Sequence, residues 1–125
     1  MTDDKQKIIA SERSGCPIAS TLDIIGDRWT LVLIRDLLTG KSRFSEFLSS
    51  PERITASVLT ARLKALEASK LVEKKAYQQR PKRYEYSLTE SGRHLAPVLQ
   101  AMCLWGNAFI KDTWVAPDAF MNYKP

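Results

Sequence analysis

The spacing of apolar residues changes near residue 70 of this 125-residue chain. Before that point, apolar residues recur every three or four positions, which predicts helices. Between Leu71 and Leu88 they alternate with polar residues, which predicts strands. We therefore expect a mainly α fold with a small β hairpin, in the order helix, helix, short helix, helix, hairpin, long helix. Two short, closely joined helices followed by a basic hairpin are typical of a winged helix-turn-helix.

The first two helices have clear boundary signals. The first is predicted to start at Cys16-Pro17 and to end before Gly26. Asp27 is a candidate N-cap for the second helix, which Thr39-Gly40 should terminate with glycine in the left-handed region. Because the second helix is apolar on nearly all sides, we expect it to lie at the centre of the core.

The third and fourth helices form the predicted helix-turn-helix. Ser42 is expected to cap the third helix, which ends at Ser49-Ser50-Pro51. Its predicted inward-facing residues are Phe44, Phe47 and Leu48. Thr55 begins the fourth helix, and Ile54 and Leu59 have the spacing of a hydrophobic staple.

The hairpin is predicted to pair strands 71–77 and 83–88 through a loop at residues 78–82. Thr89 or Ser91 should cap one last long helix that continues to about Asp112, with a bend at Pro97.

Residues 1–14 are expected to form a flexible arm with at most a short helical stretch. Residues 15–112 are expected to form the DNA-binding domain with dimerisation helices at both ends. Residues 113–125 should be an irregular aromatic tail.

The outer face of the fourth helix is the candidate DNA-reading surface. Small and polar side chains there can enter a major groove, and basic side chains around it can contact phosphates. Arg62 lies nearer the apolar side, where it has a structural role or contacts phosphate from the flank. The basic hairpin loop is a candidate wing along the DNA backbone. The predicted DNA-binding residues are Lys41, Arg43, Arg53, Thr55, Ser57, Thr60, Ala61, Arg62, Lys64, Arg80, Lys82 and Arg83. Taken separately, these residues also suit a solvated helix face and a solubilising hairpin tip.

The last helix carries an apolar stripe that is too wide for a helix resting on one small core. A DNA-binding domain of this size usually acts as a pair of copies on two half-sites, so we expect homodimerisation. The predicted dimer interface is Leu95, Val98, Leu99, Met102, Trp105 and Phe109. The alternative is that the stripe folds back on its own domain.

Composition excludes several other classes. The net charge of +5 is compatible with a nucleic-acid partner. No apolar run approaches the ~18 residues of a membrane span, and the polar N-terminus lacks a signal-peptide core, so we expect a cytoplasmic protein. Two distant cysteines and one histidine provide neither a disulfide framework nor a usual zinc site. We expect no catalytic residues, metal or cofactor.

Cys16 is a candidate redox sensor. A thiol at a helix N-terminus can become reactive, although a lone cysteine is more often a small packing residue. Cys103 borders the apolar stripe and is expected to pack, and His94 is expected to be exposed on its helix.

Several segments, in this order, resemble the HxlR-type family of bacterial winged helix-turn-helix regulators. They are Cys16-Pro17-Ile18, residues 22–31, residues 43–47, Ile54-Thr55, residues 59–63, Leu66-Glu67, residues 84–89, Gly92 and residues 97–99. The resemblance implies a homodimeric repressor or activator on a palindromic operator, with recognition helix 55–69 and wing 78–83. It further implies that a cysteine at the position of Cys16 senses electrophiles or oxidants in some members. Cys103, or Cys16 of a second copy, would then be the disulfide partner.

Two positions depart from the family pattern. Lys70 stands where a glycine usually follows the recognition helix, and a left-handed lysine costs about 1 kcal/mol. Ser57 stands where the family often carries a basic residue.

Taken together, these features lead us to expect a DNA-binding regulator that responds to Cys16 oxidation or alkylation, or to a small-molecule effector. The alternatives are a winged-helix protein-interaction module that does not read DNA, and a thiol enzyme acting through Cys16.

Overall fold

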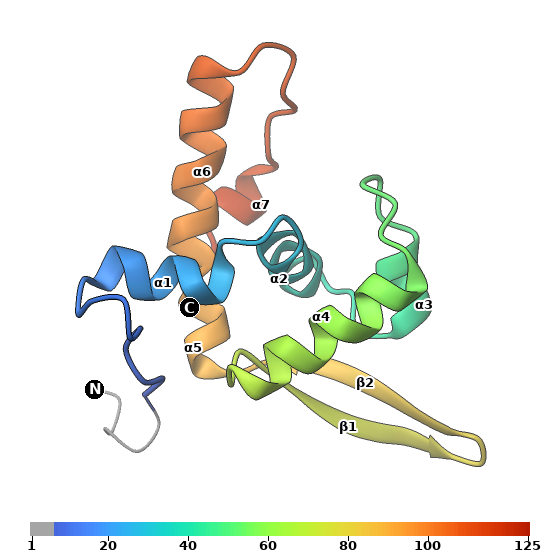
Figure 1. Ribbon diagram of the computed structural model, residues 1–125. Coiled ribbons are helices and arrows are strands. Elements are labelled where there is room, and N and C mark those ends of the chain that lie inside the picture. The colour runs from blue at the N-terminus through green and yellow to red at the C-terminus, as the bar shows by residue number, and fades with distance from the viewer. Residues whose placement is uncertain (1–6) are drawn as a thin grey trace.

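The computed structural model describes residues 7–125, which are mainly helical with one two-stranded antiparallel hairpin (Figure 1). The predicted fold class is confirmed. The elements within this range are α1 (Pro17–Ile25), α2 (Thr30–Leu38), α3 (Phe44–Leu48), α4 (Ala56–Ala68), β1 (Val72–Gln79), β2 (Lys82–Leu88), α5 (Glu90–Arg93), α6 (Ala96–Phe109) and α7 (Asp118–Met121).

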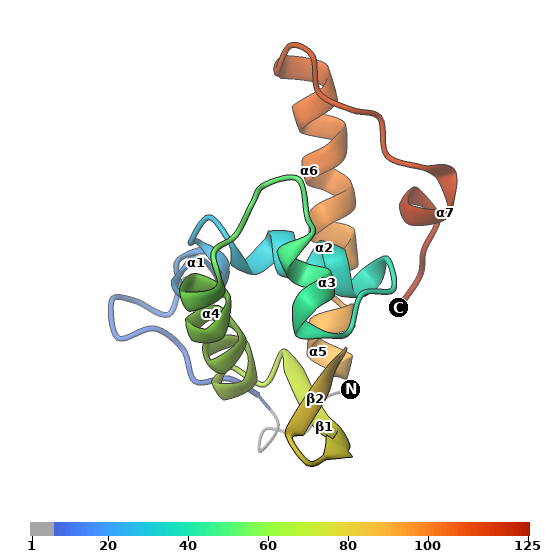
Figure 2. The same ribbon diagram turned by 90° about the vertical axis from the view of Figure 1, so that its right-hand side faces the viewer.

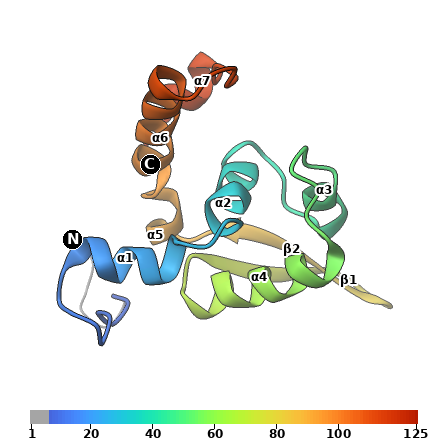
Figure 3. The same cartoon turned by 45° about the horizontal axis from the view of Figure 1, so that its top comes forward.

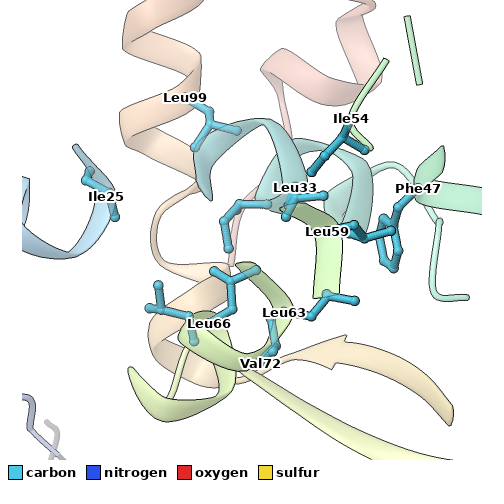
Figure 4. Close-up of a cluster of buried hydrophobic side chains, with 11 residues drawn as sticks. Ile25, Leu33, Phe47, Ile54, Leu59, Leu63, Leu66, Val72 and Leu99 are labelled. Carbon is cyan, nitrogen blue, oxygen red and sulfur yellow. The ribbon is translucent and has the colours of Figure 1, made fainter. Parts of the chain in front are cut away.

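Helix α2 lies at the centre of the core, as its apolar sequence predicts. Leu33 and Ile34 of α2 are buried together with Phe47 of α3 and Leu59 of α4 (Figure 4). Ile25, Leu99 and Val72 bring α1, α6 and the hairpin onto the same cluster. A single core therefore fixes α4 and the hairpin relative to each other.

The start of α2 refines the expected role of Asp27. The cap residue by backbone conformation is Trp29, two residues later. The carboxylate of Asp27 nevertheless accepts the backbone N–H groups of Trp29 and Thr30, at 3.0 and 2.8 Å, and the Thr30 hydroxyl. Asp27 therefore supplies the capping acceptor from outside the helix.

Two predictions for α3 are wrong. Its N-cap is Arg43 and not Ser42, because the Glu46 carboxylate accepts both the Ser42 and the Arg43 backbone N–H groups. These two bonds also hold the pKa of Glu46 below its usual value. Leu48 is exposed, since a five-residue helix has one buried side and Phe47 occupies it.

Helix α4 has the predicted start. The Thr55 hydroxyl accepts the Val58 backbone N–H, and Ile54 and Leu59 are both buried in the core, as a staple requires. Beyond Ala68, Lys70 adopts φ 62°. The Lys70 N–H donates to the Glu67 carbonyl and the Leu71 N–H to the Leu66 carbonyl, which closes the helix as a Schellman motif.

The hairpin turn is tighter than predicted. Gln79 pairs with Lys82, so only Arg80 and Pro81 connect the strands, and a bulge lies between Ala76 and Gln78. Tyr84, Tyr86 and Leu88 alternate along one side of β2, as their period predicts, and all three are half-buried. The Tyr86 backbone N–H donates to the Ser42 carbonyl at 2.7 Å, which joins the hairpin to the segment before α3.

The predicted long helix is two helices. Thr89 caps α5, the chain breaks from the helix at His94 and Leu95, and α6 begins at Ala96 and ends at Phe109. Pro97 lies in the first turn of α6, where its missing N–H costs nothing, so the chain starts a new helix instead of bending one. Figures 1 and 2 show α6 rising away from the end of the molecule that holds the hairpin.

The segments at both ends of the described chain contact helices: the C-terminal tail contacts α6, and Arg13 contacts α1. The tail contains the short helix α7, where we expected irregular structure, and the Gln100 amide donates to the Phe120 and Tyr123 carbonyls. Residues 7–14 contain no helix, and Arg13 pairs with Asp23 of α1 at 2.6 Å. Residues 1–6 of the predicted arm lie outside the described residues. Between residues 7 and 125, no helix combines the length and apolar character that crossing a bilayer requires.

Candidate nucleic-acid interface

The outer face of α4 is exposed along its length. Ser57, Thr60, Ala61 and Lys64 all point away from the buried Leu59, Leu63 and Leu66. The Thr60 hydroxyl donates to the Ala56 carbonyl at 2.9 Å, and the Thr55 hydroxyl is engaged as the cap. The Ser57 hydroxyl lies 3.4 Å from the Thr55 hydroxyl, and Lys64 is exposed, so both can present polar groups to DNA around the methyl group of Ala61.

Arg62 of α4 pairs with a residue that precedes α2. Its guanidinium lies 3.3 Å from the Asp27 carboxylate, and its side chain is one-third exposed. Partial burial raises the pKa of Asp27, but the bonds from Thr30 and Trp29 and the charge of Arg62 outweigh it and leave that pKa lowered. Arg62 thus anchors the recognition helix to the start of α2.

The hairpin carries the predicted basic group at its tip. Arg80, Lys82 and Arg83 are all exposed. The Lys82 ammonium lies 5.8 Å from the centre of the Tyr84 ring, which keeps this cation close to the strand. Figures 1 and 3 show α4 and the hairpin together at one end of the molecule, so the two predicted DNA-contacting elements share a side.

The three remaining predicted cations have different surroundings. The Lys41 ammonium donates to the Ser50 hydroxyl at 2.7 Å, so it is held inside the domain. The Arg43 guanidinium lies 3.8 Å from the centre of the Tyr77 ring and 3.8 Å from Glu85, in a position beside the wing. Arg53 is exposed and adopts φ 60° in the turn before α4.

Sequence reasoning missed a buried polar network that supports this turn. Asp36 of α2 is 2% exposed and accepts the Ser50 hydroxyl at 2.5 Å. Arg35 donates to Asp36 and, through two nitrogens at 2.7 Å each, to Glu52. The bonds from Arg35 lower the pKa of Glu52. The available signal was an Arg-Asp pair inside an otherwise apolar helix.

A broad apolar surface lies away from the hairpin. On α6, Val98, Met102, Trp105 and Phe109 are exposed, and the rings of Trp105 and Phe109 are tilted at 42° to each other with centres 5.5 Å apart. Ile18 and Leu22 of α1 are exposed as well. Leu99 was predicted to lie in the interface, but its side chain is buried in the core of its own chain. Leu95 is partly buried and packs against the same core.

Both cysteines are free thiols. Cys16 is exposed at the N-cap of α1, with Pro17 following it. Cys103 is half-buried on α6. His94 is exposed, and its Nδ1 lies 2.8 Å from the Glu90 carbonyl. In the part of the chain that the structure describes, no three potential metal ligands come together.

The profile of the HxlR-like helix-turn-helix family matches residues 24–113, which contain the whole helix-turn-helix, the hairpin and α6. The chain belongs to the HxlR-like helix-turn-helix family. It is an HxlR-type transcriptional regulator, and its winged-helix architecture is the one that the sequence predicts.

Relatives of this HxlR-type regulator agree in sequence and fold. The uncharacterised HTH-type transcriptional regulator YybR of Bacillus subtilis is 41% identical over 104 residues, which are 83% of each chain. The redox regulator HypR in its oxidised form is 43% identical, with a TM-score of 0.67 over 74% of this chain and 96% of HypR. The reduced transcriptional regulator YodB from B. subtilis is 33% identical, with a TM-score of 0.66 over 79% of this chain and 98% of YodB.

Proposed function

We propose that this HxlR-type regulator binds a palindromic operator in double-stranded DNA as a homodimer. In this proposal α4 of each copy enters a major groove, and the wing lies along flanking phosphates. The observation that carries the proposal is the position of the exposed Ser57–Lys64 face beside the basic hairpin, at one end of the molecule. The function requires no catalytic step, and a regulator of chromosomal operators would act in the cytoplasm.

The charges divide the predicted contacts by role. Lys64, Arg80, Lys82 and Arg83 are exposed cations that suit phosphates. Lys41 and Arg62 are engaged with Ser50 and Asp27 and are assigned to hold the recognition helix in place. Ser57 and Ala61 are the side chains best placed to contact base edges, because they are small and exposed in the first half of α4.

The apolar surface of α1 and α6 supports the homodimer. Large exposed hydrophobic side chains on two neighbouring helices are what an interface between copies would remove from water. Figure 1 shows α6 extending away from the hairpin, so a second copy that packs on α6 could leave α4 uncovered. Val98, Met102, Trp105 and Phe109 are the proposed α6 contacts.

Cys16 is the proposed sensor of oxidants or electrophiles. Its thiol is exposed at a helix N-terminus, where an attacking reagent can reach it. The related protein HypR is a redox regulator, which supports the same kind of response here. Oxidation of Cys16 to a disulfide with Cys16 of a second copy, or with Cys103, would change the spacing between two recognition helices.

The test begins by selecting binding sequences from a random duplex pool with the reduced full-length protein. Fluorescence anisotropy then compares the enriched duplex with a scrambled one across a salt series. We expect selective binding with a steep salt dependence, because phosphate contacts release counterions. Ala61→Glu should abolish this selective binding, since it places a carboxylate on the outer face of α4, whereas Ala61→Ser should retain it. Failure to enrich any duplex would instead support a protein-interaction module.

A further inference from the structure

A cavity of about 430 Å³ lies between α2, α6 and the C-terminal tail. Its apolar walls include Leu31 and Val32 of α2, Leu99 and Met102 of α6, and Val115 and Phe120 of the tail. This volume is within the range of pockets that bind small organic molecules. The family profile ends at residue 113, so the outer wall is formed by residues beyond the match.

Two polar attachments hold the tail over this cavity. Near the end of α6, the Asn107 amide donates to the Thr113 hydroxyl and the Trp114 carbonyl, both at 2.9 Å. Nearer its start, the Gln100 amide donates to the Phe120 and Tyr123 carbonyls. Residues 115–117 pass between these attachments, and Figure 2 shows the tail standing off from α6. The tethered tail therefore forms one wall of a cavity that stays open to solvent.

The cavity and the exposed apolar surface lie on different sides of α6. Successive residues of a helix are about 100° apart. Leu99, Cys103 and Gly106 consequently lie together on the cavity side. Val98, Trp105 and Phe109 lie roughly 100° around the helix from them. Met102 lies between these two groups and is both exposed and part of the cavity wall, so a second copy on Val98, Trp105 and Phe109 would border the cavity.

The polar groups of the wall are already engaged. Arg35, the one charged side chain lining the cavity among residues 7–125, donates to the carboxylates of Asp36 and Glu52, which balance its charge. The Thr39 hydroxyl donates to main-chain carbonyls of α2, and the Asn107 amide nitrogen donates to the tail. A charged ligand would therefore find no unbalanced partner, whereas an uncharged apolar ligand fits the walls. The Trp114 side chain also lines the cavity and is 80% exposed, which leaves an aromatic surface for a ring to cover.

We propose that this cavity is the binding site of an uncharged aromatic small molecule. The consequence for DNA rests on the proposed function: Arg35 joins the cavity wall to Glu52, three residues before the Thr55 cap of the recognition helix. A ligand that displaces Arg35 would loosen the turn before α4. The effector of this regulator would then act through α2, separately from Cys16.

The test uses N-phenyl-1-naphthylamine, an uncharged aromatic dye that fluoresces strongly in apolar surroundings, with the reduced full-length protein. We expect saturable binding of one dye per chain. Gly106→Leu should weaken it on the order of tenfold or more, since the new side chain extends into the cavity. A Cβ at Gly106 meets no atom within 4 Å, so this variant should fold. Ala108→Leu adds the same side chain to an exposed position on another side of α6 and should leave dye binding unchanged.

Three results would overturn the proposal. The first is the absence of saturable dye binding, and the second is equal dye affinity in the two leucine variants. The third concerns oligomeric state, measured by size-exclusion chromatography with light scattering: Gly106→Leu loses an oligomer that the wild type and Ala108→Leu both form. The last would show that the cavity belongs to an interface between copies. Dye binding is measured without DNA, so failure to bind an operator leaves this result standing. With the enriched duplex, saturating dye should lower the affinity of the wild type and leave that of Gly106→Leu unchanged.

Discussion

The Asp27 carboxylate joins the start of α2 to the recognition helix. One of its oxygens accepts the backbone N–H groups of Trp29 and Thr30, and the other lies 3.3 Å from the Arg62 guanidinium on α4. One side chain thus caps the central helix and fixes the rotation of α4 about its axis. The outward direction of Ser57 and Lys64 depends on this contact as well as on the core.

Removing this carboxylate should destabilise the fold. Asp27→Ala loses the capping acceptor and the partner of Arg62, so we expect a loss of about 1–2 kcal/mol in the free energy of unfolding. Urea denaturation followed by circular dichroism measures it. Glu73→Ala, at an exposed position of β1, should stay within about 0.5 kcal/mol of the wild type. An Asp27→Ala variant as stable as Glu73→Ala would contradict the capping role.

The same contact predicts a pH dependence. The pKa of Asp27 is lowered in the folded chain from its ordinary value of 3.8, so its ionised form stabilises the fold above about pH 4. That contribution is lost as pH falls through the folded-state pKa. The stability difference between wild type and Asp27→Asn should therefore be constant between pH 7 and 5 and should shrink toward pH 3. Urea titrations at each pH measure it, and an undiminished difference at pH 3 would show that the ionised carboxylate, held by Thr30, Trp29 and Arg62, is not the stabilising form.

Lys70 offers a stabilising substitution. Its φ of 62° closes α4 in a conformation that glycine adopts without steric cost. Lys70→Gly should raise the free energy of unfolding by about 1 kcal/mol. Ser69→Gly is the matched control, because Ser69 has φ −81° and glycine there only adds chain entropy to the unfolded state. Equal effects of the two variants would show that backbone strain at Lys70 is absent.

The wing should contribute affinity without sequence preference. Arg80→Ala removes one exposed cation per hairpin, so the slope of log affinity against log salt should fall by roughly 1 for each wing that contacts a phosphate. The ratio of affinities for the enriched and scrambled duplexes should stay constant. Lys124→Ala, in the tail, should change neither quantity. A changed ratio in Arg80→Ala would instead assign base readout to the wing.

Cys16 should carry the redox response. Treatment with diamide is expected to alter the operator affinity of the wild type and to leave that of Cys16→Ser unchanged, whereas Cys103→Ser keeps the response only if Cys103 is not the disulfide partner. Non-reducing gel electrophoresis of the same samples identifies the bond. A cross-linked pair of chains in Cys103→Ser indicates a disulfide between two Cys16 residues. An unchanged response in Cys16→Ser would exclude this thiol as the sensor.

The fold was predictable where the signal is local. The Ile54–Leu59 staple, the alternation of Tyr84, Tyr86 and Leu88, and the stop at Gly40 each depend on a few neighbouring residues, and all are present. The direction of Leu48 was not predictable in this way. A five-residue helix has too few turns to define an apolar side. Phe47 occupies the buried position, where its ring contacts the ring of Tyr86 from the hairpin.

The candidate site was predictable in outline. Exposed residues of α4 and the hairpin follow from helical and strand periodicity. The engagement of Lys41 with Ser50, and of Arg35 with Glu52, joins residues that are distant in sequence, and no periodic pattern reports such pairs. The same holds for the division at His94 and Leu95. A bend at Pro97 was expected, but proline also starts helices, and only the packing of α5 and α6 against their neighbours distinguishes the two outcomes.

The break between α5 and α6 sets the angle between α6 and the rest of the protein. Two residues, His94 and Leu95, connect the winged domain to the helix that carries the exposed apolar side chains. In the proposed homodimer, substitutions there would change the angle at which α6 leaves the winged domain, and with it the separation of the two α4 helices, while the side chains proposed to face DNA stayed the same. Such a regulator could acquire operators with a different number of base pairs between half-sites and keep its preferred half-site sequence, so spacing and sequence preference could evolve separately.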